Sequence, residues 1–264
     1  MLPKKFNVFG IGVSSTSYRE ALEVVINAAK QKTSLCITHL AVHGLVTSAR
    51  DEHLKNIINK FDIVAPDGQP VKNALNLLYK TKLIDRVCGP LFILLVCERA
   101  AAEGIGVYLY GSQLRVVQKL RDNLLKKYTK LRIVGSEPSI FRPLTADEDK
   151  VLVENINNSK AGIVFIGLGC PLQERFAYEH RNKIQAVQIC VGAAFDFHAG
   201  EKKIAPRWMQ KYSLEWMFRL LQEPRRLFKR YLVTNTLFLF FLFSQYARIN
   251  KYCNKIKSNN REVA

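Results

Sequence analysis

The sequence lacks the cysteine and histidine spacings that mark metal and redox sites. Its six cysteines form no CxxC pair and mostly lie in apolar runs, so we interpret them as reduced core residues of a cytosolic protein. His39 and His43 are four residues apart, but no HExxH motif accompanies them. We therefore expect these histidines to contact substrate or to be buried, and we expect no metal.

Acidic residues are scarce. The 264 residues include 40 Lys and Arg but only 22 Asp and Glu, a formal net charge of +18. From residue 201 onward, 14 Lys and Arg stand against 4 acids. This asymmetry favours an anionic partner for the C-terminal segment, either lipid headgroups, a pyrophosphate or a nucleic acid. The alternative is a solvated basic face with no partner.

Long apolar runs are also missing. The run at 231–243 is 13 residues long and contains polar residues, so at about 1.5 Å per residue it extends roughly 20 Å. A hydrocarbon core is about 30 Å thick, and we expect this segment to lie on a membrane rather than to cross it. The first residues, MLPKKFNVFGIGV, are interrupted by Asn7 and glycines and lack a cleavage site, so no signal peptide is expected.

No dinucleotide-binding fingerprint is present. Gly10-x-Gly12 leads into serines, and no G-x-G-x-x-G follows a strand pattern, which argues against a dinucleotide-dependent oxidoreductase. With 48% hydrophobic and 23% charged residues, the composition is that of a globular chain. Its length is sufficient for a full core, as one large domain or as a domain with an appendage.

Strand and helix patterns alternate along most of the chain, which predicts right-handed βαβ units. We expect a Rossmann-like α/β fold with a mostly parallel sheet and helices on both faces. A basic, amphipathic helical appendage at 201–264 follows a core at 1–200. Strands are predicted near 6–13, 35–42, 61–65, 105–110, 131–135, 161–166 and 186–191. Helices are predicted to end near 30 and 60 and to span 70–79, 90–103, 112–127, 145–157 and 171–183.

Such a sheet binds ligands beyond the carboxyl ends of its strands. Asp67 follows a predicted strand within Pro66-Asp67-Gly68, where a carboxylate can reach a substrate hydroxyl as a general base. The alternative is a turn residue with an Asx hydrogen bond. Gly167-x-Gly169 precedes a helix and would let backbone N–H groups approach a phosphate, although tight turns need the same residues.

Two acidic motifs have alternative interpretations as helix starts. Gln173 and Glu174 fall in the first turn of a predicted helix, where they could cap the helix and complement its dipole. The triplet at 147–149 matches the D-x-D pattern of metal-dependent sugar transferases. It follows Thr145 and opens a helix, so acids beneath an N-cap explain it without a metal.

The C-terminal helices combine cations with aromatic residues. Arg226 and Arg230 are predicted to share one face of a helix opened by Pro224. Trp208 and Trp216 could stack on bases next to these cations. At helical spacing they are more typical of packing against a sheet or a bilayer interface.

Together, these segments resemble the WecG/TagA/CpsF glycosyltransferases, family 26, over about residues 6–231. The resemblance implies transfer of a sugar from a nucleotide donor, usually UDP-linked, to a polyprenyl-diphosphate-linked sugar at the cytoplasmic membrane, with inversion at the anomeric carbon. Members make teichoic acid linkage units, enterobacterial common antigen or exopolysaccharide. The most specific segments are FDIVAPDG (61–68), RVCG (86–89), FIGLGCPLQE (165–174) and the block from GAAFDFHAG to KRY (192–231).

The resemblance also assigns residues. It implies a catalytic base at Asp67, an active-site threonine at Thr38 and an arginine at Arg86. The substrate-binding set that we expect adds the family's glutamine, its C-terminal arginines that close over the site, and the strand-end residues described above. This set is Gln173, Gly167, Gly169, His39, His43, Arg219, Arg226 and Arg230.

Two positions depart from the family pattern. Ala41 stands near the end of the second predicted strand, where an asparagine is usual. This departure bears on donor or acceptor preference. Ile204 replaces the arginine of the family's R-A-P element, so one expected cation is absent or is replaced by Lys203.

The expected partners are a UDP-sugar, a polyprenyl-diphosphate acceptor and an anionic membrane surface, with no cofactor. The enzyme would then be peripheral on the inner face of the cell membrane, and a homo-oligomer is left open. The rival hypothesis is a nucleotide-binding sheet whose basic C-terminus grips nucleic acid. The apolar run LFLFFLF fits that hypothesis badly, so no nucleic acid is expected. Truncation after about residue 200 is expected to leave a folded core with little activity.

Overall fold

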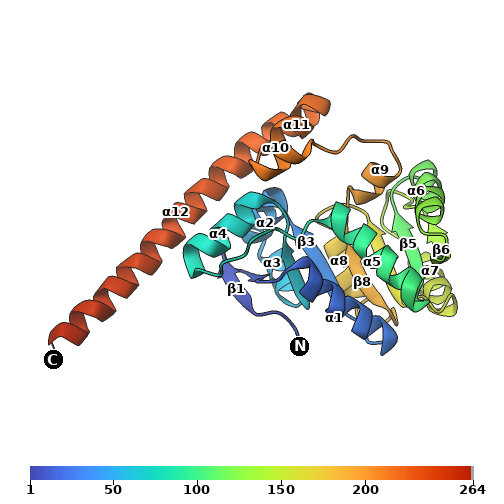
Figure 1. Cartoon of the computed structure of the whole chain (residues 1–264), viewed down its shortest axis with the longest axis horizontal. Helices are drawn as coiled ribbons and strands as arrows, with labels where there is room; N and C mark the ends of the chain where they lie inside the picture. The colour runs from blue at the N-terminus through green and yellow to red at the C-terminus, as the bar shows by residue number, and fades with distance from the viewer. Residues whose placement is uncertain (263–264) are drawn as a thin grey trace.

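The computed structural model describes the backbone of residues 1–262 and the side chains of residues 1–206 and 208–251 (Figure 1). Its centre is a six-stranded parallel sheet in the order β4-β3-β8-β7-β5-β6. The predicted Rossmann-like α/β fold is confirmed, and six of the predicted strands are the six of this sheet. They are β3 (Cys36–Leu40), β4 (Ile63–Pro66), β5 (Gly106–Gly111), β6 (Arg132–Glu137), β7 (Ile163–Gly167) and β8 (Val187–Cys190).

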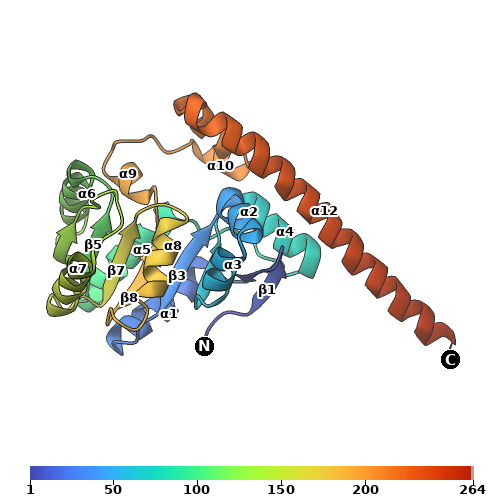
Figure 2. The ribbon, with the colours of Figure 1, turned by 180° about the vertical axis from the view of Figure 1, so that it is seen from behind.

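Helices cover both faces of the sheet because alternate strand residues point to opposite sides. Ile37 and Phe165 contribute to one buried cluster, and Cys36 and Val164 to the other. The first cluster lies under α1 (Tyr18–Lys30), α5 (Gly89–Glu103), α6 (Leu114–Lys127) and α9 (Ala194–His198). The second, seen from behind in Figure 2, lies under α2 (Val42–Arg50), α3 (Glu52–Asn59), α4 (Gln69–Tyr79), α7 (Ala146–Asn158) and α8 (Leu172–Glu179).

The prediction of one strand at 6–13 is wrong. This segment is an antiparallel hairpin, β1 (Lys5–Val8) and β2 (Ile11–Ser14), separate from the main sheet. Phe9 and Gly10 turn the chain with φ angles of 58° and 90°, the backbone signs of a two-residue hairpin turn. The predicted helix ending near residue 60 is likewise two helices, because Asp51 breaks it and its side chain accepts a hydrogen bond from the Leu54 N–H at 3.0 Å.

The C-terminal segment forms three helices, the last of which runs past the core as one long rod (Figures 1 and 2). One of its faces docks on the hairpin. Phe238 is buried with its ring centroid 5.4 Å from that of Phe9, and the Gln245 side chain accepts a hydrogen bond from the Phe9 N–H at 3.0 Å. The helices are α10 (Arg207–Lys211), α11 (Glu215–Gln222) and α12 (Pro224–Glu262).

The apolar segment of α12 is longer than the sequence pattern predicts. Thr234 and Thr236 do not interrupt the helix, because their hydroxyls donate to carbonyls four residues earlier at 2.9 and 2.7 Å. By length and composition only, the helix over 224–251 contains a segment apolar enough to cross a membrane. Length and composition therefore do not exclude a crossing, and the placement of this segment on a membrane surface stays a prediction.

Candidate active site

Asp67 lies at the carboxyl end of β4, where its backbone N–H donates to the Leu40 carbonyl at 3.0 Å. Asp67 is half-buried, and the partial burial of its carboxyl group raises the pKa of Asp67 to about 6. Arg86 and Arg219 oppose the shift and Glu215 adds to it. Asp67 is therefore ionised at neutral pH and still basic enough to accept a proton.

Arg86 ties the core to the C-terminal helices. Its side chain is buried, its Nη1 lies 2.7 Å from Oε2 of Glu215, and its Nη2 donates to Oε1 of Gln210 at 3.1 Å. Glu215 is on α11 and Gln210 is on α10. The guanidinium predicted to serve the active site is therefore also the anchor for both short helices.

Arg219 reaches the same cluster from α11. Its Nη2 lies 2.6 Å from Oε1 of Glu215, and its guanidinium carbon lies 5.1 Å from the centroid of the Phe197 ring. Burial by itself would raise the pKa of Glu215, but the charges of Arg219 and Arg86 hold it below its ordinary value. One carboxylate thus bridges two arginines beside Asp67.

A second polar cluster is buried where β3 meets the start of α8. The Thr38 hydroxyl donates to Oε1 of Glu174 at 2.8 Å, and Nε2 of Gln173 donates to the same oxygen at 2.9 Å. Burial raises the pKa of Glu174. Oε2 of Glu174 and Oε1 of Gln173 are buried without a hydrogen-bond partner among the described residues. No side chain forms a hydrogen bond at the N-cap of α8, but Glu174 lies in the first turn, where an acidic residue complements the helix dipole.

The two histidines differ in their surroundings. Nδ1 of His39 lies 3.1 Å from the Cys190 carbonyl and must donate to it, which leaves Nε2 as a buried acceptor with no partner in the described part of the chain. Burial lowers the pKa of His39 to about 4. Burial, and then the charge of Arg230, lower the pKa of His43 to about 4. Both imidazoles are therefore neutral at physiological pH.

The glycines of the 167–173 turn have structural explanations. A Cβ on Gly167 would lie 2.6 Å from the Phe195 ring, so packing alone requires glycine there. Gly169 has a φ of +79° and open space around its Cα, so it is required by its backbone conformation. A phosphate-binding role for this turn stays a prediction.

The three predicted arginines do not converge. The charge of Arg219 acts on Asp67, whereas the charge of Arg230 acts on His43 and on Cys170 in the glycine-rich turn. Arg226 is exposed and pairs with Glu223, which lies between α11 and α12. The structure therefore brings two of these arginines to the carboxyl edge of the sheet, at different positions.

The D-x-D triplet opens a helix, as the sequence indicates. The Thr145 side chain accepts from the Glu148 N–H, and the Glu148 side chain accepts from the Thr145 N–H, which is a complete capping box. Asp149 lies 2.6 Å from Nε2 of His180. These acids stabilise local structure and lie outside the cluster around Asp67.

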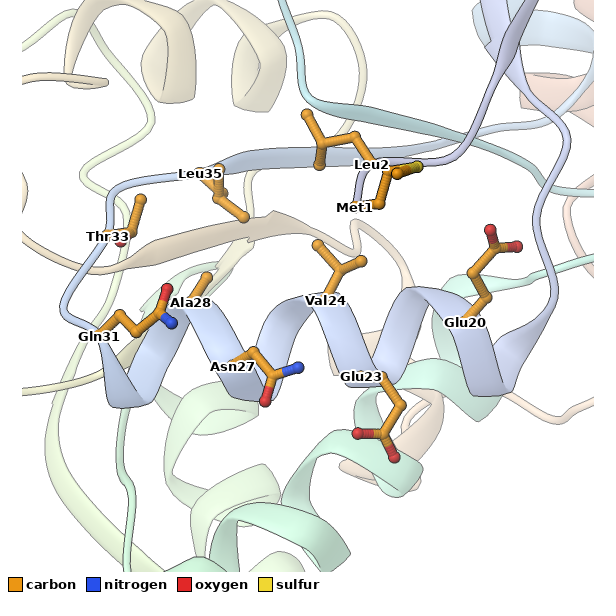
Figure 3. A pocket seen from close by; sticks show the side chains of 10 residues that line it. All are labelled: Met1, Leu2, Glu20, Glu23, Val24, Asn27, Ala28, Gln31, Thr33 and Leu35. Atoms are coloured by element: carbon orange, nitrogen blue, oxygen red, sulfur yellow. The ribbon is translucent and has the colours of Figure 1, made fainter.

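Two cavities are open at the surface. One of about 340 Å³ lies between α1 and the first residues of the chain, where Figure 3 shows Val24, Met1 and Leu2 around it. None of the predicted site residues lines it. The other, of about 390 Å³, is lined by the segments 16–19 and 82–86 and includes Arg86. It adjoins the candidate site from the side of α1.

The sequence profile of the glycosyl transferase WecG/TagA/CpsF family matches residues 6–252. The chain belongs to this family. It is a WecG/TagA/CpsF glycosyltransferase, and membership implies a sugar donor and a lipid-linked acceptor in the synthesis of cell-surface polysaccharide. The match includes both the sheet and most of α12.

Sequence reasoning missed three residues of the candidate site. Glu215 and Gln210 bind Arg86, and Glu174 binds Thr38. A signal existed for Glu215, which is one of only 4 acids from residue 201 onward and is flanked by Leu214 and Trp216. No local pattern indicates that Gln210 meets Arg86, because the two are 124 residues apart.

Proposed function

We propose that this glycosyltransferase moves a sugar from a UDP-sugar to a polyprenyl-diphosphate-linked saccharide at the inner surface of the cell membrane, with inversion at the anomeric carbon. The observation that carries the proposal is Asp67, a carboxylate at the rim of a parallel sheet with its pKa raised to about 6 by burial and with arginines beside it. A raised pKa is what a general base for a sugar hydroxyl needs.

The proposed step is a single displacement. The acceptor hydroxyl loses its proton to the Asp67 carboxylate as its oxygen bonds to the anomeric carbon. The bond from that carbon to the donor phosphate oxygen breaks, and UDP leaves with the electron pair. Arg86 and Arg219, which act on Asp67 electrostatically, supply positive charge for the developing diphosphate.

The other predicted residues would bind substrate around this step. Nε2 of His39 is a buried acceptor without a partner among the described residues, as are Oε1 of Gln173 and Oε2 of Glu174. Buried polar atoms are ordinarily paired, so these atoms are well suited to sugar hydroxyl groups. Arg230, whose charge acts on Cys170, adds a cation near the glycine-rich turn for an anionic group.

The exposed face of α12 supports attachment to a membrane surface. Phe228, Phe240 and Phe243 are more than half exposed, and exposed cations, Arg225 and Lys229, lie on the same helix. Apolar side chains with cations suit an interface that contains anionic lipid. Up to residue 251, the other exposed apolar residues of α11 and α12 are Trp216, Met217, Leu221, Leu232, Val233, Leu239 and Tyr246.

The docked face of α12 favours lying on the membrane over crossing it. Nε2 of Gln245 donates to the Asn7 carbonyl at 2.7 Å, and the Phe241 ring lies 5.6 Å from that of Phe9. A crossing helix would have to leave these partners or carry the polar backbone of the hairpin into hydrocarbon. Unpaired polar groups there cost several kcal/mol each, on the order of 2–7 kcal/mol.

The test is Asp67→Asn, assayed with a panel of UDP-sugars on a short-chain polyprenyl-diphosphate acceptor. We expect turnover to fall by about 100-fold or more, because an amide cannot take the proton, while UDP binding by calorimetry is retained. Asp122→Asn, which removes an exposed carboxylate on α6, is the matched control and should leave the rate unchanged. Near-normal turnover of Asp67→Asn would remove Asp67 from its role.

A further inference from the structure

Glu215 occupies an unusual position among the C-terminal cations. Its two carboxylate oxygens lie 2.7 Å from Nη1 of Arg86 and 2.6 Å from Nη2 of Arg219. The side chains of Arg86 and Glu215 are only 9% and 19% exposed, so the contact is shielded from solvent. Shielded ion pairs depend strongly on both partners, because removal of one leaves an uncompensated charge.

The short helices have little else that holds them to the core. None of the residues of α11 is buried, and the buried apolar residues that flank it in the sequence are Met209 on α10 and Leu227 on α12. Burial of apolar surface, which fixes most helices in a fold, is therefore small here. The polar contacts of Arg86 with Glu215 and Gln210 must supply much of the orientation of α11.

We propose that Glu215 is a positioning residue for the active site, which bridges Arg219 on α11 to Arg86 on the core and places one negative charge between the two arginines. This inference rests on the proposed function, because it takes Asp67 as the base. Without the bridge, two arginines would face Asp67 with no carboxylate between them. The base would then be ionised but weaker, and it would take the proton of a sugar hydroxyl less readily.

The charges around Asp67 determine the direction of the effect. Burial raises the pKa of Asp67, Arg86 and Arg219 lower it, and Glu215 raises it. Tyr18 on α1 and Cys88 before α5 also face this cluster, and burial raises the pKa of both, so they stay neutral. Loss of the Glu215 charge must therefore lower the pKa of Asp67.

The experiment is a pH profile of kcat/KM in the full-length protein carrying Glu215→Gln. The wild-type rate is expected to fall below about pH 6, following the pKa of Asp67. This fall in kcat/KM at low pH is the acid limb of the profile. In Glu215→Gln we expect the acid limb to move to lower pH by about half a unit or more, and we expect kcat to be about tenfold lower. Glu215→Asp, which keeps the charge, should keep the limb near its wild-type position.

Glu201→Gln is the matched control. Glu201 also bridges two cations, with Oε2 and Oε1 lying 2.5 and 2.8 Å from Arg115 and Lys119. Its loss should leave both the limb and kcat unchanged. A limb that stays in place in Glu215→Gln, or one that moves equally in Glu201→Gln, would overturn the proposal.

A readout that needs no turnover separates this inference from the proposed function. The pH dependence of the difference in Tm between a parent protein and its Asp67→Asn variant reports the pKa of Asp67. In a Glu215→Gln background this dependence should shift to lower pH, whatever the protein catalyses. If the pH dependence of the Tm difference shifts but Asp67→Asn is fully active, the proposed function fails, and the effect of the Glu215 charge on Asp67 is supported. If Asp67→Asn is inactive but the dependence does not shift, only the role of Glu215 fails.

Discussion

Asp67 is held in a state that costs the fold some stability. Burial raises its pKa from the ordinary 3.8 to about 6, which means that the folded protein binds the Asp67 proton more tightly than the unfolded chain does. Stability from this group is therefore present at low pH and is lost as pH rises from about 4 through about 6. At neutral pH, the buried carboxylate of a general base therefore lowers the free energy of unfolding, whereas a neutral side chain at the same position would not.

This penalty predicts a pH-dependent gain in stability for Asp67→Asn. Above about pH 6 the variant should have a higher Tm than the wild type, because it carries no buried charge. Below about pH 4 the difference should disappear, since the wild-type carboxyl group is then protonated. Differential scanning calorimetry between pH 4 and pH 8 measures it. A Tm difference that is constant across this range would mean that Asp67 is not desolvated.

At the scale of single residues, the sequence predicted Asp67, Thr38 and Arg86 as site residues. The structure places Thr38 within β3 and Asp67 directly after β4, and Arg86 precedes Val87, whose N–H donates to the Pro66 carbonyl at the end of β4. Their roles stay predictions. The partners of these residues were not predictable. Glu174 reaches Thr38 from α8, and this contact exists only because β3 and β8 pair in the sheet with α8 packed across them.

At the scale of elements, strands and helices were largely predictable, because hydrophobic periodicity is a local property. The errors lie where one residue changes the backbone. Gly10 allows a tight turn inside an apolar run, and Asp51 ends one helix and caps the next. Both residues are common in turns, but apolar continuity obscured the first and helical spacing the second.

The glycine-rich turn gives a test at this scale. Gly167→Ala places a methyl group 2.6 Å from the Phe195 ring, and overpacking of this kind costs about 1–3 kcal/mol. We expect that loss in the free energy of unfolding, measured by chemical denaturation. Phe195→Leu should cost less in the Gly167→Ala background than in the wild type, because the smaller side chain relieves the contact.

Gly169→Ala is the matched variant for that experiment. Its Cβ meets no atom within 4 Å, and its cost comes from the φ of +79° alone, about 1–2 kcal/mol. Phe195→Leu can be measured in the wild type, in Gly167→Ala and in Gly169→Ala. If it lowers the free energy of unfolding by the same amount in all three proteins, the packing explanation for Gly167 is wrong. That result would leave close approach of a ligand as the reason for glycine at that position.

At the scale of the whole molecule, α12 has two different faces. Its inner face carries Phe238 and Gln245 against the hairpin, and its outer face carries exposed aromatic rings and cations. Deletion of the segment after residue 200 would uncover Phe9 and the surface of α2, so a loss of activity in that fragment has more than one cause. Substitutions on the outer face test membrane attachment more cleanly.

Phe240→Ser combined with Phe243→Ser is expected to weaken binding to vesicles containing anionic lipid by about tenfold or more. Both side chains are exposed, at 65% and 68%, and a fully buried ring contributes on the order of 1.5–3 kcal/mol. Flotation with phosphatidylglycerol vesicles measures the effect, and the Tm should not change. Phe141→Ser, at an equally exposed ring on the core (70%), should bind like the wild type. Undiminished binding of the double variant would place the membrane contact elsewhere.

By itself, the sequence determined the alternating α/β fold, the family and the positions of the strand-end residues, because periodicity and motifs are encoded in neighbouring residues. Only the tertiary structure decided which charges surround Asp67. Arg86 belongs to the core and Glu215 to α11, and they meet because the chain returns across the carboxyl edge of the sheet. Ion pairing depends on distance and burial in space, and neither quantity can be read from separation along the chain.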